Sequence, residues 1–185
     1  LNFCTVDLSA FYFDIRKDAL YCDSKDSDRR SSSIIVLNII LESLIKWFAP
    51  ILSFTTEEIY RLIDKDKKSI HLENFMEFPK MFENINLNKK WLELKKIRDI
   101  CNVSIEAKRT AKEIGSSLES NLIISLNKDL YEISNQVDFA ELCITSSATV
   151  TKSTSEEVMV ETKKATGNKC PVCWKITQDK CARHS

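Results

Sequence analysis

The chain has 185 residues, of which 43% are hydrophobic and 29% are charged, and its formal net charge at pH 7 is zero. These values are ordinary for a soluble globular protein, and the length suits one large domain or two small ones. The only two glycines, Gly115 and Gly167, exclude a glycine-rich phosphate loop or dinucleotide fingerprint. Two histidines leave little for histidine-based acid–base catalysis.

The first half of the sequence has the apolar periodicity of helices. Residues 8–22 place apolar side chains at steps of three and four, which predicts one amphipathic helix. Residues 34–48 are apolar nearly all round, as expected of the central helix of a bundle. A long helix is predicted over residues 88–112, with Gly115 as its C-terminal cap.

Between these helices, Pro50 breaks the apolar pattern and a new helix start follows. Thr55 and Glu58 have the spacing of a capping box, and Phe54 and Ile59 have that of a hydrophobic staple. We therefore expect a helix from this point to residue 63, followed by a charged turn over residues 64–68.

After Gly115 the apolar period changes from helical to two. This change predicts a strand over residues 122–126, a short helix over 128–137 and a second strand over 141–145. Residues 146–157 are rich in Ser and Thr and are predicted to form a loop, and a third strand is expected around Val158 and Val160. The predicted fold is mainly α: a helical bundle over residues 1–115, a small α/β subdomain over 116–160, and a terminal knuckle over 161–185.

The terminal knuckle carries two short pairs of metal-ligating residues. Cys170 and Cys173 form the first pair, and Cys181 and His184 follow after a seven-residue spacer. Four such ligands fill a tetrahedral shell, so we expect one structural zinc per chain and no open position for metal catalysis. A redox Cys-x-x-Cys is the alternative, but it would lie beside a βαβ pattern and would not need the second pair.

The remaining cysteines and the charge distribution indicate location and partner. Cys4, Cys22, Cys101 and Cys143 stand isolated in apolar patterns, where cysteine acts as a small hydrophobe, which favours a reducing, cytoplasmic compartment. No signal peptide opens the sequence and no apolar run approaches about 18 residues, so no membrane association is expected. The chain starts at Leu1, which suggests a segment of a longer polypeptide. Residues 161–185 carry six Lys or Arg against two acidic residues, as suits a nucleic-acid contact.

Five motifs, in this order, resemble the C-terminal part of bacterial isoleucyl-tRNA synthetases. They are Leu8–Cys22 (LSAFYFDIRKDALYC), Ala49–Tyr60 (APILSFTTEEIY), Ile97–Asp99 (IRD), Glu113–Glu119 (EIGSSLE) and Lys169–Lys175 (KCPVCWK). The first two are similar to class I synthetases for valine and leucine as well. The fourth motif, followed by the Cys-Pro-x-Cys-Trp knuckle, narrows the resemblance to isoleucine.

The resemblance implies an anticodon-binding helical domain, a small α/β subdomain and a zinc module that helps to hold the anticodon stem-loop. The implied enzyme charges isoleucine tRNA with isoleucine using ATP, with its catalytic and editing domains upstream in the same polypeptide; we expect a monomer. The His-x-Gly-His and Lys-Met-Ser-Lys-Ser signatures of class I synthetases do not occur in this sequence, so we expect no catalysis by this segment alone. Family members usually close the knuckle with a second Cys-x-x-Cys, where this chain has His184.

Anticodon bases are single-stranded, and proteins read them by stacking on aromatic or guanidinium planes and by contacting their edges. The predicted tRNA contacts are basic residues beside helices and the residues that follow the second zinc cysteine: Arg16, Lys17, Arg29, Arg30, Trp174 and Lys175. Each has a simpler interpretation, because charged helix positions are often merely solvated and Trp174 could simply cover the metal.

Two other functions fit the knuckle. The zinc module of a DNA-repair glycosylase has similar Cys-x-x-Cys pairs, but no matching catalytic or helix-turn-helix segment precedes it here; binding to duplex DNA rather than folded tRNA would identify it. A zinc-stapled protein-interaction domain would show salt-insensitive association and no RNA affinity.

Overall fold

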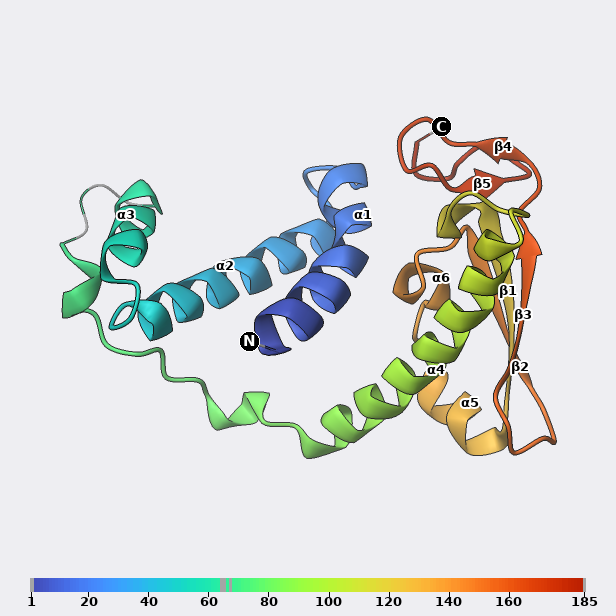
Figure 1. The fold of residues 1–185 in the computed structure, drawn as a ribbon, viewed down its shortest axis with the longest axis horizontal. Helices are drawn as coiled ribbons and strands as arrows, with labels where there is room; N and C mark the ends of the chain where they lie inside the picture. The colour runs from blue at the N-terminus through green and yellow to red at the C-terminus, as the bar shows by residue number, and fades with distance from the viewer. Residues whose placement is uncertain (1, 64–65, 67, 185) are drawn as a thin grey trace. The chain divides into compact units, whose positions relative to one another are not determined.

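The computed structural model describes residues 2–63, 66 and 68–184, and it confirms a mainly helical chain with a small sheet (Figure 1). The chain divides into two compact units. The first unit contains residues 1–22 and 84–185, and the second contains residues 23–83. Most of the charged turn predicted over residues 64–68 lies outside the described residues.

The first unit begins with a π-helical segment, Phe3–Phe13, that continues directly into α1, Asp14–Cys22. Its longest helix is α4, Ile85–Thr110, which starts at the cap Asn84, whose side-chain oxygen accepts a hydrogen bond from the Leu87 amide. A 3₁₀ turn, Ser117–Glu119, and the short helices α5, Lys128–Ser134, and α6, Phe139–Leu142, complete its helical part.

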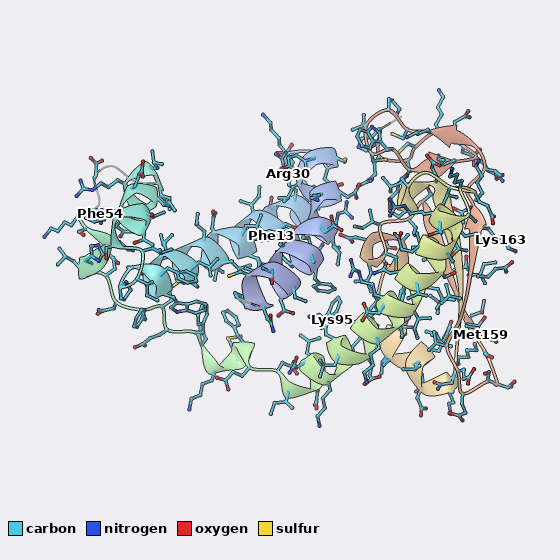
Figure 2. The ribbon with its side chains drawn as sticks, viewed as in Figure 1. Phe13, Arg30, Phe54, Lys95, Met159 and Lys163 are labelled. Atoms are coloured by element: carbon cyan, nitrogen blue, oxygen red, sulfur yellow. The ribbon has the colours of Figure 1, made fainter. Side chains whose placement is uncertain are left out.

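The sheet of the first unit has three strands in the order β2-β1-β3. The central strand β1, Ser120–Leu126, pairs in parallel with β2, Ser147–Lys152, and antiparallel with β3, Met159–Lys164. Helix α4 packs along this sheet, and a small hairpin of β4, Asn168–Lys169, and β5, Ile176–Thr177, lies near one end of it (Figure 1). Met159 and Lys163 lie on the exposed edge strand β3 (Figure 2).

One hydrophobic core connects α1, α4 and the sheet. Alternate residues of β1 are buried because successive strand side chains point to opposite faces. The core consists mainly of one stripe of α4, one face of β1 and single residues of neighbouring elements: Ile15, Leu94, Ile97, Cys101, Ile105, Leu122, Ile124, Leu126 and Phe139. This packing brings residues 3–22 into the same unit as residues 84–185.

The strand predicted over residues 141–145 is wrong, because α6 occupies this region. The Asp138 carboxylate accepts hydrogen bonds from the amides of Ala140 and Glu141, which caps the helix at its N-terminus. The loop predicted over residues 146–157 is also wrong in its first half, where Thr149, Val150 and Thr151 belong to β2. β-Branched side chains such as Thr and Val favour a pleated strand. The Ser and Thr content of the segment is typical of a loop, and the sequence pattern therefore did not reveal β2.

The predicted cap at Gly115 is also wrong. Helix α4 ends at Thr110, and Lys112 takes the left-handed conformation with φ of 58°. The Glu113 amide donates to the Lys108 carbonyl at 3.1 Å, the long-range hydrogen bond of a Schellman ending. Gly115 instead donates its amide to the Glu119 carboxylate at 2.8 Å.

The second unit contains α2, Asp28–Phe48, α3, Ser53–Ile63, and the 3₁₀ turns Ile70–Leu72 and Lys80–Phe82. Ser27 caps α2 by accepting a hydrogen bond from the Arg30 amide. The small core of this unit is formed by Ile45, Ala49, Tyr60 and Ile70, with Ile59 packed against it.

Helix α2 is not the buried centre of a bundle, which corrects the sequence-based expectation. Ile35 is 59% exposed, and among the residues of α2 only Ser33, Ser43 and Ile45 are buried. By length and composition alone α2 is also long and apolar enough to cross a membrane, so the expectation that no segment reaches that threshold is wrong. One such helix is weak evidence, since core helices of soluble proteins pass the same test.

Helix α3 begins two residues before the predicted cap. The Thr56 amide already donates to the Leu52 carbonyl at 3.0 Å, so Thr55 lies within the first turn. Phe54 is 93% exposed (Figure 2), which rules out the predicted staple with Ile59. Glu57 on the same helix accepts hydrogen bonds from the Ile70 amide and from Arg61, and these hold the pKa of its carboxyl below the usual range.

The core of the first unit predicts a contrast between two leucines of α4. Leu94 is fully buried, so Leu94→Ala should lower the free energy of unfolding by about 2–5 kcal/mol through reduced burial and a residual cavity. Leu92, which is 53% exposed, is the matched control, and Leu92→Ala should cost less than about 1 kcal/mol. Urea unfolding monitored by circular dichroism measures both changes; equal costs would contradict the assignment of the core.

Candidate metal centre and nucleic-acid interface

Four side chains of the knuckle converge on one point. The sulfurs of Cys170, Cys173 and Cys181 and a ring nitrogen of His184 all lie within 4.8 Å of one another. The Cys173 and Cys181 sulfurs are 3.8 Å apart, and His184 Nδ1 lies 3.4 Å from the sulfurs of both Cys170 and Cys181. The two pairs expected from their spacing are therefore brought together.

The β4–β5 hairpin and two tight turns create this convergence. The Trp174 amide donates to the Cys170 carbonyl at 3.0 Å, and the Cys170 amide donates to the Lys175 carbonyl at 2.9 Å, which folds the first pair back on itself. Gly167 enters the hairpin with φ of 129°, where a Cβ would lie 2.3 Å from the Thr177 carbonyl oxygen. Only glycine fits this position without a backbone shift.

Local amides favour the thiolate form at two of the cysteines. The backbone amide of Cys173 donates toward the Cys170 sulfur and lowers the pKa of that thiol to about 6. The Arg183 amide similarly lowers the pKa of the Cys181 thiol. Burial raises the pKa of Cys173, against the opposing effect of the Lys175 amide. Thiolates are the form that binds metal, so these turns prepare part of the donor set.

The donor set fits a tetrahedral metal ion. Bonds of ~2.3 Å to sulfur and ~2.0 Å to nitrogen at tetrahedral angles separate two sulfurs by ~3.8 Å and a sulfur from a nitrogen by ~3.5 Å. Three of the six separations, 3.8 Å between the Cys173 and Cys181 sulfurs and 3.4 Å from His184 Nδ1 to the sulfurs of Cys170 and Cys181, match these values, and all four ligand atoms lie within 4.8 Å of one another. A cluster of three cysteines and one histidine with this geometry can bind a metal ion.

The knuckle also contacts the last turns of α1. His184 Nε2 lies 2.7 Å from the carbonyl oxygen of Cys22, the last residue of α1. The two terminal nitrogens of Arg183 each donate a hydrogen bond to the Asp18 carboxylate, at 2.8 and 2.9 Å. The contact with the Cys22 carbonyl raises the pKa of the His184 ring.

A pocket of about 330 Å³ lies between α1, α6 and the knuckle. Its α1 side is formed by Asp14, Ile15, Lys17, Asp18, Tyr21 and Cys22, and its knuckle side by Val172, Cys173, Trp174 and Lys175. Tyr21 and Trp174 are 81% and 59% exposed, so both side chains are accessible from solvent. Lys169 lies over the Trp174 ring, 5.7 Å from its centre. Tyr21 was not among the predicted tRNA contacts. Its position four residues after Lys17, on the same face of α1, was the available signal that the two side chains lie together.

Three of the predicted tRNA contacts, Lys17, Trp174 and Lys175, line this pocket. Arg16 does not line it and instead forms an ion pair with Glu141, at 2.8 Å, across to α6. Lys17 pairs with Asp14 at 2.9 Å, and this carboxylate raises the pKa of the Lys17 amine.

Arg29 and Arg30 belong to the second unit, whereas the residues that line the pocket belong to the first. Arg29 pairs with the nearly buried Asp23 carboxylate through contacts of 2.7 and 2.8 Å. The Arg30 Nε atom is buried and has no hydrogen-bond partner among the described residues.

The sequence profile of the anticodon-binding domain of tRNA ligases matches residues 1–125. The chain belongs to this family. Three similar proteins are named isoleucine–tRNA ligase: those of Pelagibacter ubique, at 74% identity over all of this chain, Agrobacterium fabrum, at 40% over 97% of it, and Methylacidiphilum infernorum, at 42% over 95% of it. These matches confirm the resemblance drawn from the motifs. The chain spans about a fifth of the length of these relatives (19–20%).

The geometry of the knuckle predicts one metal ion per chain. Elemental analysis of protein purified without chelator should find one equivalent, and Co²⁺ added to the metal-free protein should give the absorption of a tetrahedral thiolate site. Cys173→Ser should abolish most of this binding because it removes one of four ligands.

Cys4→Ser is the matched control for this test, since Cys4 lies outside the cluster, and it should retain the full equivalent. Full metal content in a variant that combines Cys181→Ser with His184→Ala would show that the ligands are assigned wrongly.

Proposed function

We propose that this chain is the tRNA-recognition segment of an isoleucine–tRNA ligase, an enzyme that charges its tRNA with isoleucine using ATP. The family match over residues 1–125, together with 74% identity over the whole chain to a protein of that name, carries this proposal. In the proposal, the ligand is the anticodon arm of isoleucine tRNA, and the catalytic and editing steps belong to other parts of the same polypeptide.

The proposed metal is one zinc ion in a structural role. Three thiolates and one imidazole satisfy a closed zinc shell and leave no position for a substrate or an activated water. Bound zinc would fix both turns of the knuckle, the first of which carries Trp174 and Lys175. The proposed segments remain residues 1–115 for the helical anticodon-binding part, 116–160 for the α/β subdomain and 161–185 for the zinc knuckle.

The pocket between α1 and the knuckle is the proposed contact for one unstacked base of the anticodon loop. Tyr21 and Trp174 offer exposed aromatic side chains, and stacking of a base on such a ring contributes ~1–3 kcal/mol. Lys17 and Lys175 supply positive charge for neighbouring phosphates. Arg16, Arg29 and Arg30 are proposed as additional phosphate or base contacts.

The two alternative functions have less support. A glycosylase zinc module or a protein-interaction knuckle would account for residues 161–185 but not for the anticodon-binding match over residues 1–125. We further propose that the full protein is a cytoplasmic monomer. Competition between duplex DNA and folded tRNA separates the first alternative from tRNA recognition.

The proposed interface predicts a salt-dependent decrease in tRNA affinity when the knuckle is removed. Titration of isoleucine tRNA and a non-cognate tRNA against the full-length protein, with and without residues 168–185, a truncation that leaves β3 intact, should show weaker binding of the truncated form. Its salt slope should also be shallower, by ~0.7–0.9 for each phosphate that the knuckle neutralises. Unchanged affinity, salt slope and aminoacylation would restrict the knuckle to a structural role.

Single variants separate base contacts from phosphate contacts within this interface. Trp174→Ala should weaken binding by roughly 1–3 kcal/mol without changing the salt slope, because stacking involves no phosphate, whereas Lys175→Ala should weaken both tRNAs about equally and make the salt slope shallower. Lys96→Ala is the matched control, because this exposed lysine of α4 is paired with Glu93 and is not a pocket residue. It should change neither affinity.

The 185-residue chain alone should form no isoleucyl-adenylate. The two class I signatures, which bind the phosphates of ATP and stabilise the negative charge of the transition state, are missing from its sequence. ATP–pyrophosphate exchange with isoleucine measures this step. Activity above that of a mock purification would overturn the non-catalytic assignment.

A further inference from the structure

The last two residues that the structure describes, Arg183 and His184, both reach the C-terminal end of α1. Arg183 makes a two-bond ion pair with Asp18, and His184 Nε2 lies 2.7 Å from the Cys22 carbonyl oxygen. Asp18 and Cys22 are four residues apart and therefore lie one above the other on the same helix face. Residues about 160 positions apart in the sequence thus meet along the last turn of α1.

The end of a helix needs such partners. The final carbonyl groups of α1 have no amide one turn later to bond to, and they carry the negative end of the helix dipole. A donor at the Cys22 carbonyl satisfies one of these groups. The Arg183 guanidinium beside Asp18 adds positive charge near the same end.

The two ring nitrogens of His184 face different partners. Nδ1 lies among the cysteine sulfurs, and Nε2 lies against the Cys22 oxygen. A neutral imidazole that gives its Nδ1 lone pair to a metal must carry its proton on Nε2, where it donates to that oxygen. Metal binding therefore selects the tautomer that caps α1.

We propose that Arg183 and His184 form a metal-dependent latch on α1, in which the metal-bound His184 caps the helix through Nε2–H. The latch rests on the proposed metal site and goes beyond it, since the fourth ligand is assigned a second task. A cysteine at position 184 would still complete a four-ligand shell, but its single sulfur could not bind the metal and also donate to Cys22. Histidine at this position thus adds a connection that the ligand count alone does not need.

The latch has a consequence for the proposed tRNA contact. Asp18 and Cys22 lie on one side of the 330 Å³ pocket and Val172–Lys175 lie on the other, so the latch joins its two walls. Removal of the metal or of the cap would release the last turn of α1, which carries Tyr21 and follows directly on the turn that carries Lys17. The metal would then control the pocket without touching the RNA.

Amide hydrogen exchange by mass spectrometry of the full-length protein tests the latch, with zinc measured on the same samples. Chelation of zinc should speed exchange of the amides at residues 18–22 by roughly three- to tenfold, the effect of removing one hydrogen bond at a helix end. His184→Cys should keep its zinc and also speed exchange at these residues, by a smaller factor than chelation because the Arg183–Asp18 pair remains. Peptides from the middle of α4 serve as the internal reference and should not change in this variant.

Arg183→Met provides a second variant that alters no ligand. It should retain zinc and speed exchange at residues 18–22 by a smaller factor, because the cap at Cys22 remains. Either of two results would overturn the latch. The first is a wild-type exchange rate at residues 18–22 after zinc has been removed, and the second is a wild-type rate there in a variant that retains its zinc. A wild-type protein that contains no zinc would overturn the metal site as well, whereas tRNA binding is measured separately and can stand or fall alone.

Discussion

The packing of α4 against β1 is the constraint on which the first unit depends. Leu94, Ile97 and Ile105 form one stripe of the helix, and the alternate side chains of β1 meet them with almost no exposed surface. Ile15 of α1 enters the same core, which fixes the helix carrying Arg16 and Lys17 next to α6. The hairpin that carries the metal cluster follows β3 closely in the chain, so the same core also determines where the cluster lies relative to α1.

The knuckle and α1 stabilise one another through contacts of only a few residues. The short segment that follows β3 cannot bury a core of its own, and a metal site can replace that core. The Ser146 hydroxyl accepts a hydrogen bond from the Ile176 amide at 2.7 Å, which attaches the β4–β5 hairpin to the start of β2. Arg183 and His184 contact α1, so the knuckle is attached both to the start of β2 and to α1.

Sequence reasoning located features whose cause is local and missed those decided by tertiary contacts. The long helices and β1 were found because their apolar periods are complete, and the four cluster residues were found because their spacing is a chemical requirement. The errors at α6 and β2 arose where local composition and tertiary contacts favour different structures. At β2 the Ser- and Thr-rich composition is typical of a loop, but Val150 pairs with the buried Ile124 and the segment becomes a strand. Neither the pocket nor the contact of His184 with Cys22 has a local signature, since both join residues far apart in the sequence.

Zero net charge does not prevent the pocket from accepting RNA, but it determines how. Three of the cations near it are paired with carboxylates: Lys17 with Asp14, Arg16 with Glu141 and Arg183 with Asp18. Exposed pairs of this kind are worth only about 0–1 kcal/mol, so a phosphate can draw Lys17 away from Asp14 at little cost. The carboxylates Asp14, Asp18 and Glu141 in the pocket walls repel phosphate yet can accept hydrogen bonds from the amino groups of a base. For an RNA ligand, this distribution favours a base beside the carboxylates and phosphates beside Lys17 and Lys175.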